Sequence, residues 1–289
     1  MASSRAYAEE DLGNIQLLEH VNLLIPDQPT AMVFYILGLG FTRDPYMNVG
    51  LGNMWVNLGE QQFHLPTRGQ QVIPGHIGLV VPSLSELEQR LTGVAKQLEG
   101  SKFAWSRTDD HVAVTCPWGN QFRCYGASAH YEGMRIGIPY VEFAVRPGAA
   151  AGIARFYEKV MHAPSSVEKN NGSAVVRTQV GRAQQLVFRE TDGEVSPYDG
   201  HHIAVYVANF SEPYAFMGER DLLTEEVRNH QFRFVDIVDP KSGERLHQLE
   251  HEVRSLRHPM YQRFMVNRDA TQSMGTYRRG GDDLSMAAV

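Results

Sequence analysis

The chain has 289 residues, of which 43% are hydrophobic and 21% charged, and its formal net charge is −6. This is enough apolar material for one large or two ordinary globular domains, and it excludes a chain that is disordered throughout. The net negative charge gives no excess of basic residues to bind a phosphate backbone, so we do not expect nucleic acid as a partner. No apolar run reaches 18 residues, so we do not expect a membrane as a partner either.

The N-terminus and the two cysteines indicate the compartment. The first 14 residues contain acidic side chains and lack the apolar central region of a secretory signal. Cys116 and Cys124 are too few for a disulfide framework and are expected to be reduced thiols. We therefore predict a cytoplasmic protein.

In chain order, the first half predicts two units of the form strand, helix, strand, strand, strand. The first unit starts with the apolar strand at His20 and reaches a strand hairpin within 54–65. The second starts at Pro74, continues through a helix over about 84–98 with Ser83 as its N-cap, and ends in two strands joined by a Pro-Trp-Gly-Asn turn.

The second half repeats this pattern. Aligning Phe34–Tyr35 with Phe156–Tyr157 gives an ungapped offset of 122 residues, which places His20 on Glu142. A fourth unit begins at Gly200 and ends in a strand, an Asp-Pro-Lys-Ser-Gly turn and another strand. The two aromatic pairs are expected on helix faces that pack against a sheet.

The composition of the connecting segments predicts the domain boundaries. The segment around 127–137 separates an N-terminal domain over 15–127 from a C-terminal domain over 137–253, and each contains two units. A partly mobile tail covers 254–289, and Met260, Tyr261 and Phe264 in its first part are expected to pack on the C-terminal domain. The fold class is α+β, with tandem paired βαβββ modules that form two open barrel-like domains.

The motifs LLEHVNLLIPD, FYILGLGF, GHIGLVV and PWGNQFRCYG occur in this order and have counterparts in the second half. In this order they resemble the two-domain members of the vicinal oxygen chelate superfamily, which includes glyoxalase I, fosfomycin-resistance proteins, bleomycin-binding proteins and extradiol dioxygenases. The resemblance covers roughly residues 15–252. It implies modules that pair into cups around a divalent metal ion, here Fe, Mn, Zn or Ni, and a small-molecule substrate that chelates the metal through oxygen atoms.

The resemblance also implies where metal ligands lie, namely on the first and last strands of each module. In the C-terminal half it implies Glu142, His202 and His247, two imidazoles and one carboxylate, with Glu142 as the catalytic base. The secondary candidates, in the N-terminal half, are His20, His64, His76 and Arg123. Because Arg123 is a fixed cation, that half is either a three-histidine site or a cup for an anion.

Alternation along the strands is consistent with these positions. The residues on either side of each first-strand candidate are apolar, so the candidates face the opposite, concave side of the sheet. Module pairing stays open: the first module can pair with the fourth, which would group His20 and His64 with His202 and His247, and Glu142 with His76 and Arg123. Two further alternatives are Glu250 or Glu252 as the last-strand ligand, and a salt bridge from Glu142 to an arginine in its cup.

The leading functional hypothesis is a metal-dependent enzyme of small-molecule metabolism with dioxygenase-, isomerase- or lyase-type chemistry. The alternative is a metal-free small-molecule-binding or resistance protein. The sequence leaves a homodimer open.

Overall fold

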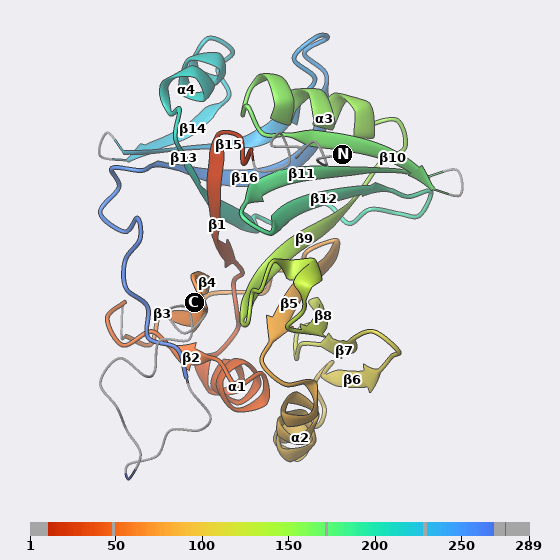
Figure 1. Ribbon diagram of the computed structural model, residues 1–289, viewed down its shortest axis with the longest axis vertical. Coiled ribbons are helices and arrows are strands. Elements are labelled where there is room, and N and C mark those ends of the chain that lie inside the picture. Colours follow the sequence, from red (N-terminus) through yellow and green to blue (C-terminus); the bar gives the residue numbers. More distant parts are fainter. Residues whose placement is uncertain (1–10, 48–49, 171–172, 228–229, 269–274, 276–289) are drawn as a thin grey trace, which may run out of the picture.

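In the computed structural model, residues 11–47, 50–170, 173–227, 230–268 and 275 are described. They form two eight-stranded mixed sheets with helices on their outer faces (Figure 1). The expected mobility of the last residues of the tail falls outside the described residues. Within the described part of the chain, no helix is both long and apolar enough to cross a bilayer.

The first sheet combines the first and the fourth modules in the order β14-β15-β16-β13-β1-β4-β3-β2. At its centre β1 and β13 run antiparallel, and each is flanked by the last strand of its own module in parallel. The strands are β1 (Ile15–Asn22), β2 (Thr42–Arg43), β3 (Asn53–Leu58), β4 (Gln61–Pro66), β13 (His202–Val207), β14 (Leu223–Val227), β15 (Gln231–Val238) and β16 (Arg245–Ser255).

The second sheet combines the second and the third modules in the order β10-β11-β12-β9-β5-β8-β7-β6. Here β5 and β9 form the antiparallel centre, and His76 lies directly opposite Glu142. The strands are β5 (Gly75–Val81), β6 (Ala104–Arg107), β7 (Val112–Thr115), β8 (Gln121–Gly126), β9 (Gly137–Val145), β10 (Ser165–Asn170), β11 (Ser173–Gly181) and β12 (Gln184–Glu190).

The helices cover the outer faces of the sheets and bury the predicted aromatic pairs. Phe34 and Tyr35 lie in the π-helical turn η2 (Met32–Gly38), which follows α1 (Gln28–Ala31), and they are fully buried, as are Phe156 and Tyr157 of α3 (Ala150–Lys159). The other helices are α2 (Leu84–Val94), the 3₁₀ turns η3 (Ala95–Leu98) and η4 (Ala129–Tyr131), and α4 (Ser211–Gly218). As predicted, the Ser83 side chain caps α2 by accepting a hydrogen bond from the Glu86 N–H.

The division into two paired-module barrels is confirmed, but each barrel takes one module from each half of the chain. In Figure 1, α1 and α2 lie together at the bottom and α3 and α4 at the top. Helices of the same half thus lie together, whereas each sheet takes one module from 15–127 and one from 137–253, so neither range closes a barrel by itself. The pairing of the first module with the fourth is the alternative that the sequence left open.

Buried polar contacts join the two sheets. The Gln184 side chain in β12 accepts a hydrogen bond from the Leu18 N–H and donates to the carbonyls of Leu18 and Ile138. Because these groups are buried, the amide satisfies backbone atoms that water cannot reach. The Gln184 side chain therefore links β1 of the first sheet to β12 of the second.

The described part of the tail contacts both modules of the first sheet. The rings of Tyr261 and Tyr206 are 4.9 Å apart, which places Tyr261 on the fourth module as expected, whereas Phe264 is 53% exposed, contrary to the expectation. Beyond it, the Asn267 side chain bonds both the N–H and the carbonyl of Gly59, in the first module. The tail thus packs on the first sheet rather than on the C-terminal half alone.

Candidate metal centre

Three histidines converge on the concave side of the first sheet. His20, His64 and His202 each offer one ring nitrogen, and these nitrogens all lie within 4.8 Å of one another. The ring centroid of His20 is 5.6 Å from that of His64 and 5.8 Å from that of His202. His64 in β4 and His202 in β13 both pair with Asn22 of β1, so three neighbouring strands bring the imidazoles together.

An irregularity in β1 sets the orientation of His20. Leu18 pairs with Val205 and His20 with Ala204, so Glu19 is an extra residue in the strand. The Glu19 carboxylate lies 2.5 Å from His20 Nδ1, and both side chains are almost fully buried. A proton on Nδ1 held by this carboxylate leaves the Nε2 lone pair facing the other two histidines.

The Nε2 atoms of all three histidines are buried and have no hydrogen-bond partner among the described residues. His64 is held in place by stacking on Trp55, with ring centroids 3.9 Å apart and planes 11° from parallel. Buried ring nitrogens normally find a partner. Three converging imidazoles that each keep a buried nitrogen without a partner are an arrangement that a metal ion satisfies.

Electrostatics keeps at least two of these rings neutral. Burial, reinforced by His20, lowers the pKa of His64 to about 2. Burial and then His20 lower the pKa of His202 well below its usual value. Because a metal ligand must present a lone pair, depressed pKa values prepare both imidazoles for coordination at neutral pH.

The fourth corner of this cup is occupied by Glu252. In the first module, His64 lies opposite Asn22, two residues after His20. In the fourth module, Glu252 of β16 lies opposite Ala204, two residues after His202, and so takes the position equivalent to His64. Its Oε2 is 3.8 Å from His202 Nε2. The alternative last-strand position named from the sequence is thus the one that the register supports.

Two arginines hold the Glu252 carboxylate. Arg233 bridges Glu250 and Glu252 at 2.5 Å each. Arg254 lies between Glu252 and Glu19, with its Nη1 2.9 Å from Glu19 Oε2. Burial opposes ionisation of Glu19, but His20 and Arg254 lower its pKa, so the buried carboxylates are balanced by guanidinium groups.

The expected C-terminal ligand set is corrected, because its members are separated in space. Glu142 is in the second sheet and His202 in the first. His247 lies against the aromatic rings of Phe143 and Phe188, at centroid distances of 6.0 and 5.9 Å. Glu142 and His202 are separated because their modules belong to different sheets. His247 was assigned by counting four residues from Gly243, and this gave the wrong position on the last strand.

The second cup contains the other candidates but has a different chemistry. Glu142 accepts two hydrogen bonds from Arg189, at 2.8 and 2.9 Å, and lies 3.7 Å from His76. Arg189 pairs with Ala144 and Arg123 with Gly78, so the two last-strand corners are both arginine. These fixed cations do not suit a metal, and the salt-bridge interpretation of Glu142 holds, with Arg189 as the partner.

A hydrogen-bonded chain forms the floor of the second cup. His76 Nε2 is 3.0 Å from the Tyr140 hydroxyl, which is 2.9 Å from that of Tyr125. The Tyr140 ring covers Gly78, where a Cβ would approach it to 2.3 Å. Burial lowers the pKa of His76 to about 4, against the opposing effect of Glu142.

Sequence reasoning missed Glu19, Arg189, Arg233 and Arg254. Glu19 precedes a candidate ligand, and only the extra residue in β1 turns it toward the same cup. In the third module, the sequence comparison matched His64 with Leu186 or Val187. The structure places Arg189 at that corner, so Arg189 was missed. For Arg254 the available signal was its place two residues after Glu252, on the same side of the last strand.

The comparisons with known proteins agree with this architecture. No family model and no curated protein sequence matches the chain. Among solved structures, glyoxalase I from Zea mays is similar at a TM-score of 0.57 and 13% identity, over 84% of this chain and 93% of that one. A candidate dioxygenase from Bacillus subtilis subsp. subtilis str. 168 is similar at a TM-score of 0.55 and 15% identity, over 84% and 86%.

The chain therefore shares the fold of these two structures, with four βαβββ modules paired in two sheets. At these identities the similarity establishes the fold alone.

Proposed function

We propose that His20, His64 and His202 bind a divalent first-row metal ion and that the protein is a metal-dependent enzyme acting on a small molecule that chelates the ion through oxygen. The observation that carries this proposal is that each of the three histidines offers one ring nitrogen within 4.8 Å of the other two and has a buried Nε2 without a hydrogen-bond partner among the described residues. Three imidazoles leave coordination positions open for a substrate.

The surrounding residues have defined roles in this proposal. A bound ion supplies Lewis acidity toward an oxygen atom of the substrate. Glu19 orients His20, and Trp55 orients His64. Glu252 lies beside His202, with its Oε2 3.8 Å from His202 Nε2, and this position makes it the proposed proton acceptor for a bound substrate. This base next to the ligand set favours isomerase- or lyase-type chemistry.

Metal content tests the ligand assignment. We expect about one ion per chain in protein purified without chelators, and loss of the ion in the double variant His20→Ala, His202→Ala. Glu142→Gln and His76→Ala are matched controls from the second cup, and both should retain the ion. Retention in the double variant, with an unchanged circular dichroism spectrum, contradicts the assignment.

A second candidate function is metal-free binding of an organic molecule in the second cup. There Glu142 forms a salt bridge with Arg189, so it is not free to bind a metal ion. A cavity of about 840 Å³ is lined by His76 and Arg123 among others. This volume is in the range of small-molecule sites. Binding that persists after metal removal and is lost in Tyr140→Ala supports this candidate.

A further inference from the structure

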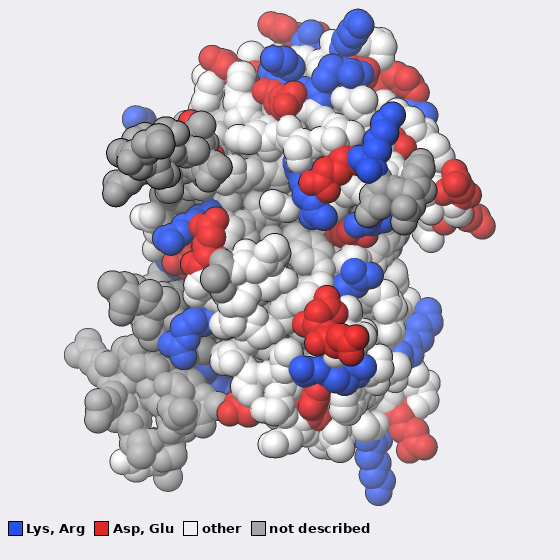
Figure 2. Space-filling model, turned by 45° about the vertical axis from the view of Figure 1, so that its right-hand side comes forward, with Lys and Arg blue, Asp and Glu red and all other residues white. Residues whose placement is uncertain are grey.

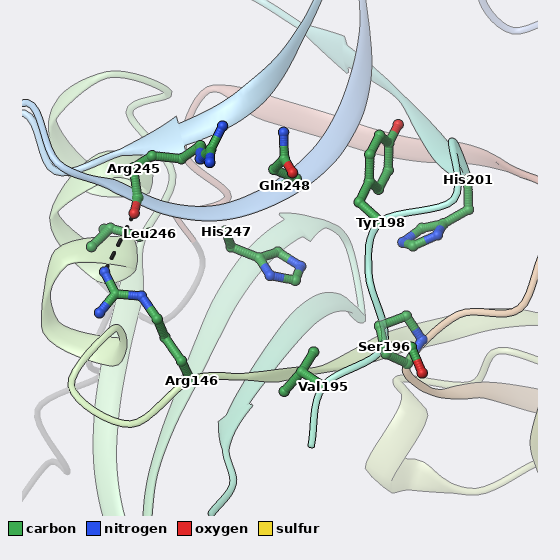
Figure 3. A pocket seen from close by; sticks show the side chains of 10 residues that line it. Arg146, Val195, Ser196, Tyr198, His201, Arg245, Leu246, His247 and Gln248 are labelled. Carbon is green, nitrogen blue, oxygen red and sulfur yellow. Dashed lines mark hydrogen bonds between the residues drawn. The ribbon is translucent and has the colours of Figure 1, made fainter. Parts of the chain in front are cut away.

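A separate cavity of about 290 Å³ lies where the two sheets meet, outside both cups. Its walls come from the end of β9, the start of β16 and the connection that leads into β13, and they include Arg146, Tyr198, His201, Arg245 and His247. Figure 3 shows the rings of His201 and His247 directed into this space from opposite sides. Clefts at such junctions are common small-molecule sites.

His201 is positioned here by a carboxylate. Its Nδ1 lies 2.7 Å from Asp199 Oδ1, and the other oxygen of Asp199 accepts a hydrogen bond from the Val72 N–H at 2.7 Å. The ring packs in parallel with Phe143 and edge-on to Tyr198. His201 is 1% exposed, so its orientation is determined by the fold.

The Nε2 atoms of both histidines lack a hydrogen-bond partner among the described residues and are shielded from solvent. For His201 the Nδ1 proton is used by Asp199, which leaves Nε2 as an acceptor. A buried acceptor without a donor costs free energy, and a hydroxyl group placed in the cavity removes that cost.

The charges around the cavity are one-sided. None of the described residues that line it is Asp or Glu, whereas Arg146 and Arg245 both line it. Arg146 contacts Glu244 and Arg245 is 3.9 Å from Asp236, and both acids lie outside the lining. On the face shown in Figure 2, acidic and basic side chains lie interspersed. Guanidinium groups without a carboxylate in the same wall suit a carboxylate ligand.

We propose that this cavity binds a small hydroxy acid, whose carboxylate lies against Arg146 and Arg245 and whose hydroxyl donates to an imidazole Nε2. The site is independent of the metal centre, because neither histidine belongs to the cluster of His20, His64 and His202. It is also distinct from the second cup, whose lining contains four carboxylates.

Malate is a suitable probe, and succinate is the same molecule without the hydroxyl group. In calorimetric titrations of metal-stripped protein, we expect saturable binding of one malate per chain and at least tenfold weaker binding of succinate. His247→Phe and Arg245→Gln should each weaken malate binding at least tenfold. Arg245 is exposed at the rim, so its variant tests the site even if His247→Phe does not fold.

Two controls define the outcome. Arg182→Gln removes an exposed arginine outside the cavity and should leave the malate affinity unchanged, as should His20→Ala in the metal cluster. Absence of saturable binding, equal affinity for succinate, or equal weakening by Arg182→Gln overturns the proposal. Loss of metal in His20→Ala with retained malate binding separates this site from the proposed metal function.

Discussion

Removal of Arg254 tests whether the first cup holds ionised, buried carboxylates. The side chain of Arg254 is 6% exposed and contacts Glu19 and Glu252, which are 1% and 3% exposed. Arg254→Met keeps most of the apolar stem and removes only the guanidinium group. Glu252 keeps Arg233 as a partner, whereas Glu19 is left with His20 alone.

The size of the effect follows from the two ways in which the variant can respond. An uncompensated buried charge costs about 3–5 kcal/mol. Protonation of Glu19 relieves it, and for a carboxyl with an ordinary pKa of about 4.3 this costs about 3.7 kcal/mol at pH 7 and about 1 kcal/mol at pH 5. We therefore expect Arg254→Met to lose roughly 3–4 kcal/mol at pH 7 and much less at pH 5.

Urea unfolding of metal-stripped protein at the two pH values measures this difference. Arg182→Met is the matched control, because Arg182 forms an exposed ion pair with Glu132 and should change stability by less than about 1 kcal/mol. A loss below about 1 kcal/mol at pH 7, or the same loss at both pH values, would refute the view that Arg254 balances a buried ionised carboxylate.

Two further predictions concern the backbone and acid stability. Gly75→Ala should destabilise the fold by more than about 2 kcal/mol, because a Cβ at this position would lie 1.9 Å from the Glu142 carbonyl oxygen, whereas Gly93→Ala in α2 meets nothing within 4 Å and should stabilise by about 0.5–1 kcal/mol in thermal unfolding. Burial lowers the pKa of His251 to about 3, so the unfolded chain binds more protons between pH 6.5 and 3 and stability falls with decreasing pH, by at most about 1.4 kcal/mol per unit. In His251→Gln, the free energy of unfolding measured by fluorescence should decline less steeply over this pH window. An unchanged slope would contradict the view that buried, neutral His251 causes the decline.

Much of the fold could be predicted because its signals are local. Apolar alternation predicted the first strands at His20, His76, Glu142 and His202, and the serine and glutamate spacing predicted the start of α2 at Ser83. The aromatic pairs are buried as expected because their positions follow helical periodicity.

The candidate site was predicted only in part. His20, His64 and His202 were each named from the sequence, yet the leading set combined His202 with Glu142 and His247. The error at His247 arose because β16 is longer than its turn motif indicates and pairs His202 with Glu250. The pairing of β15 with β16 is also irregular between Gln248 and His251, so counting residues along β16 does not give the face of a side chain. His247 instead lies against Phe143 and Phe188.

The repeated pattern in the sequence determined that this protein has four βαβββ modules, because strand and helix periodicities depend on neighbouring residues. Which modules share a sheet was decided only by the tertiary structure. That choice depends on contacts between strands far apart in the sequence, such as β5 with β9 and, more than a hundred residues apart, β1 with β13. It places three imidazoles in one cup and two arginines in the other, so the chemistry of each cup follows from the pairing.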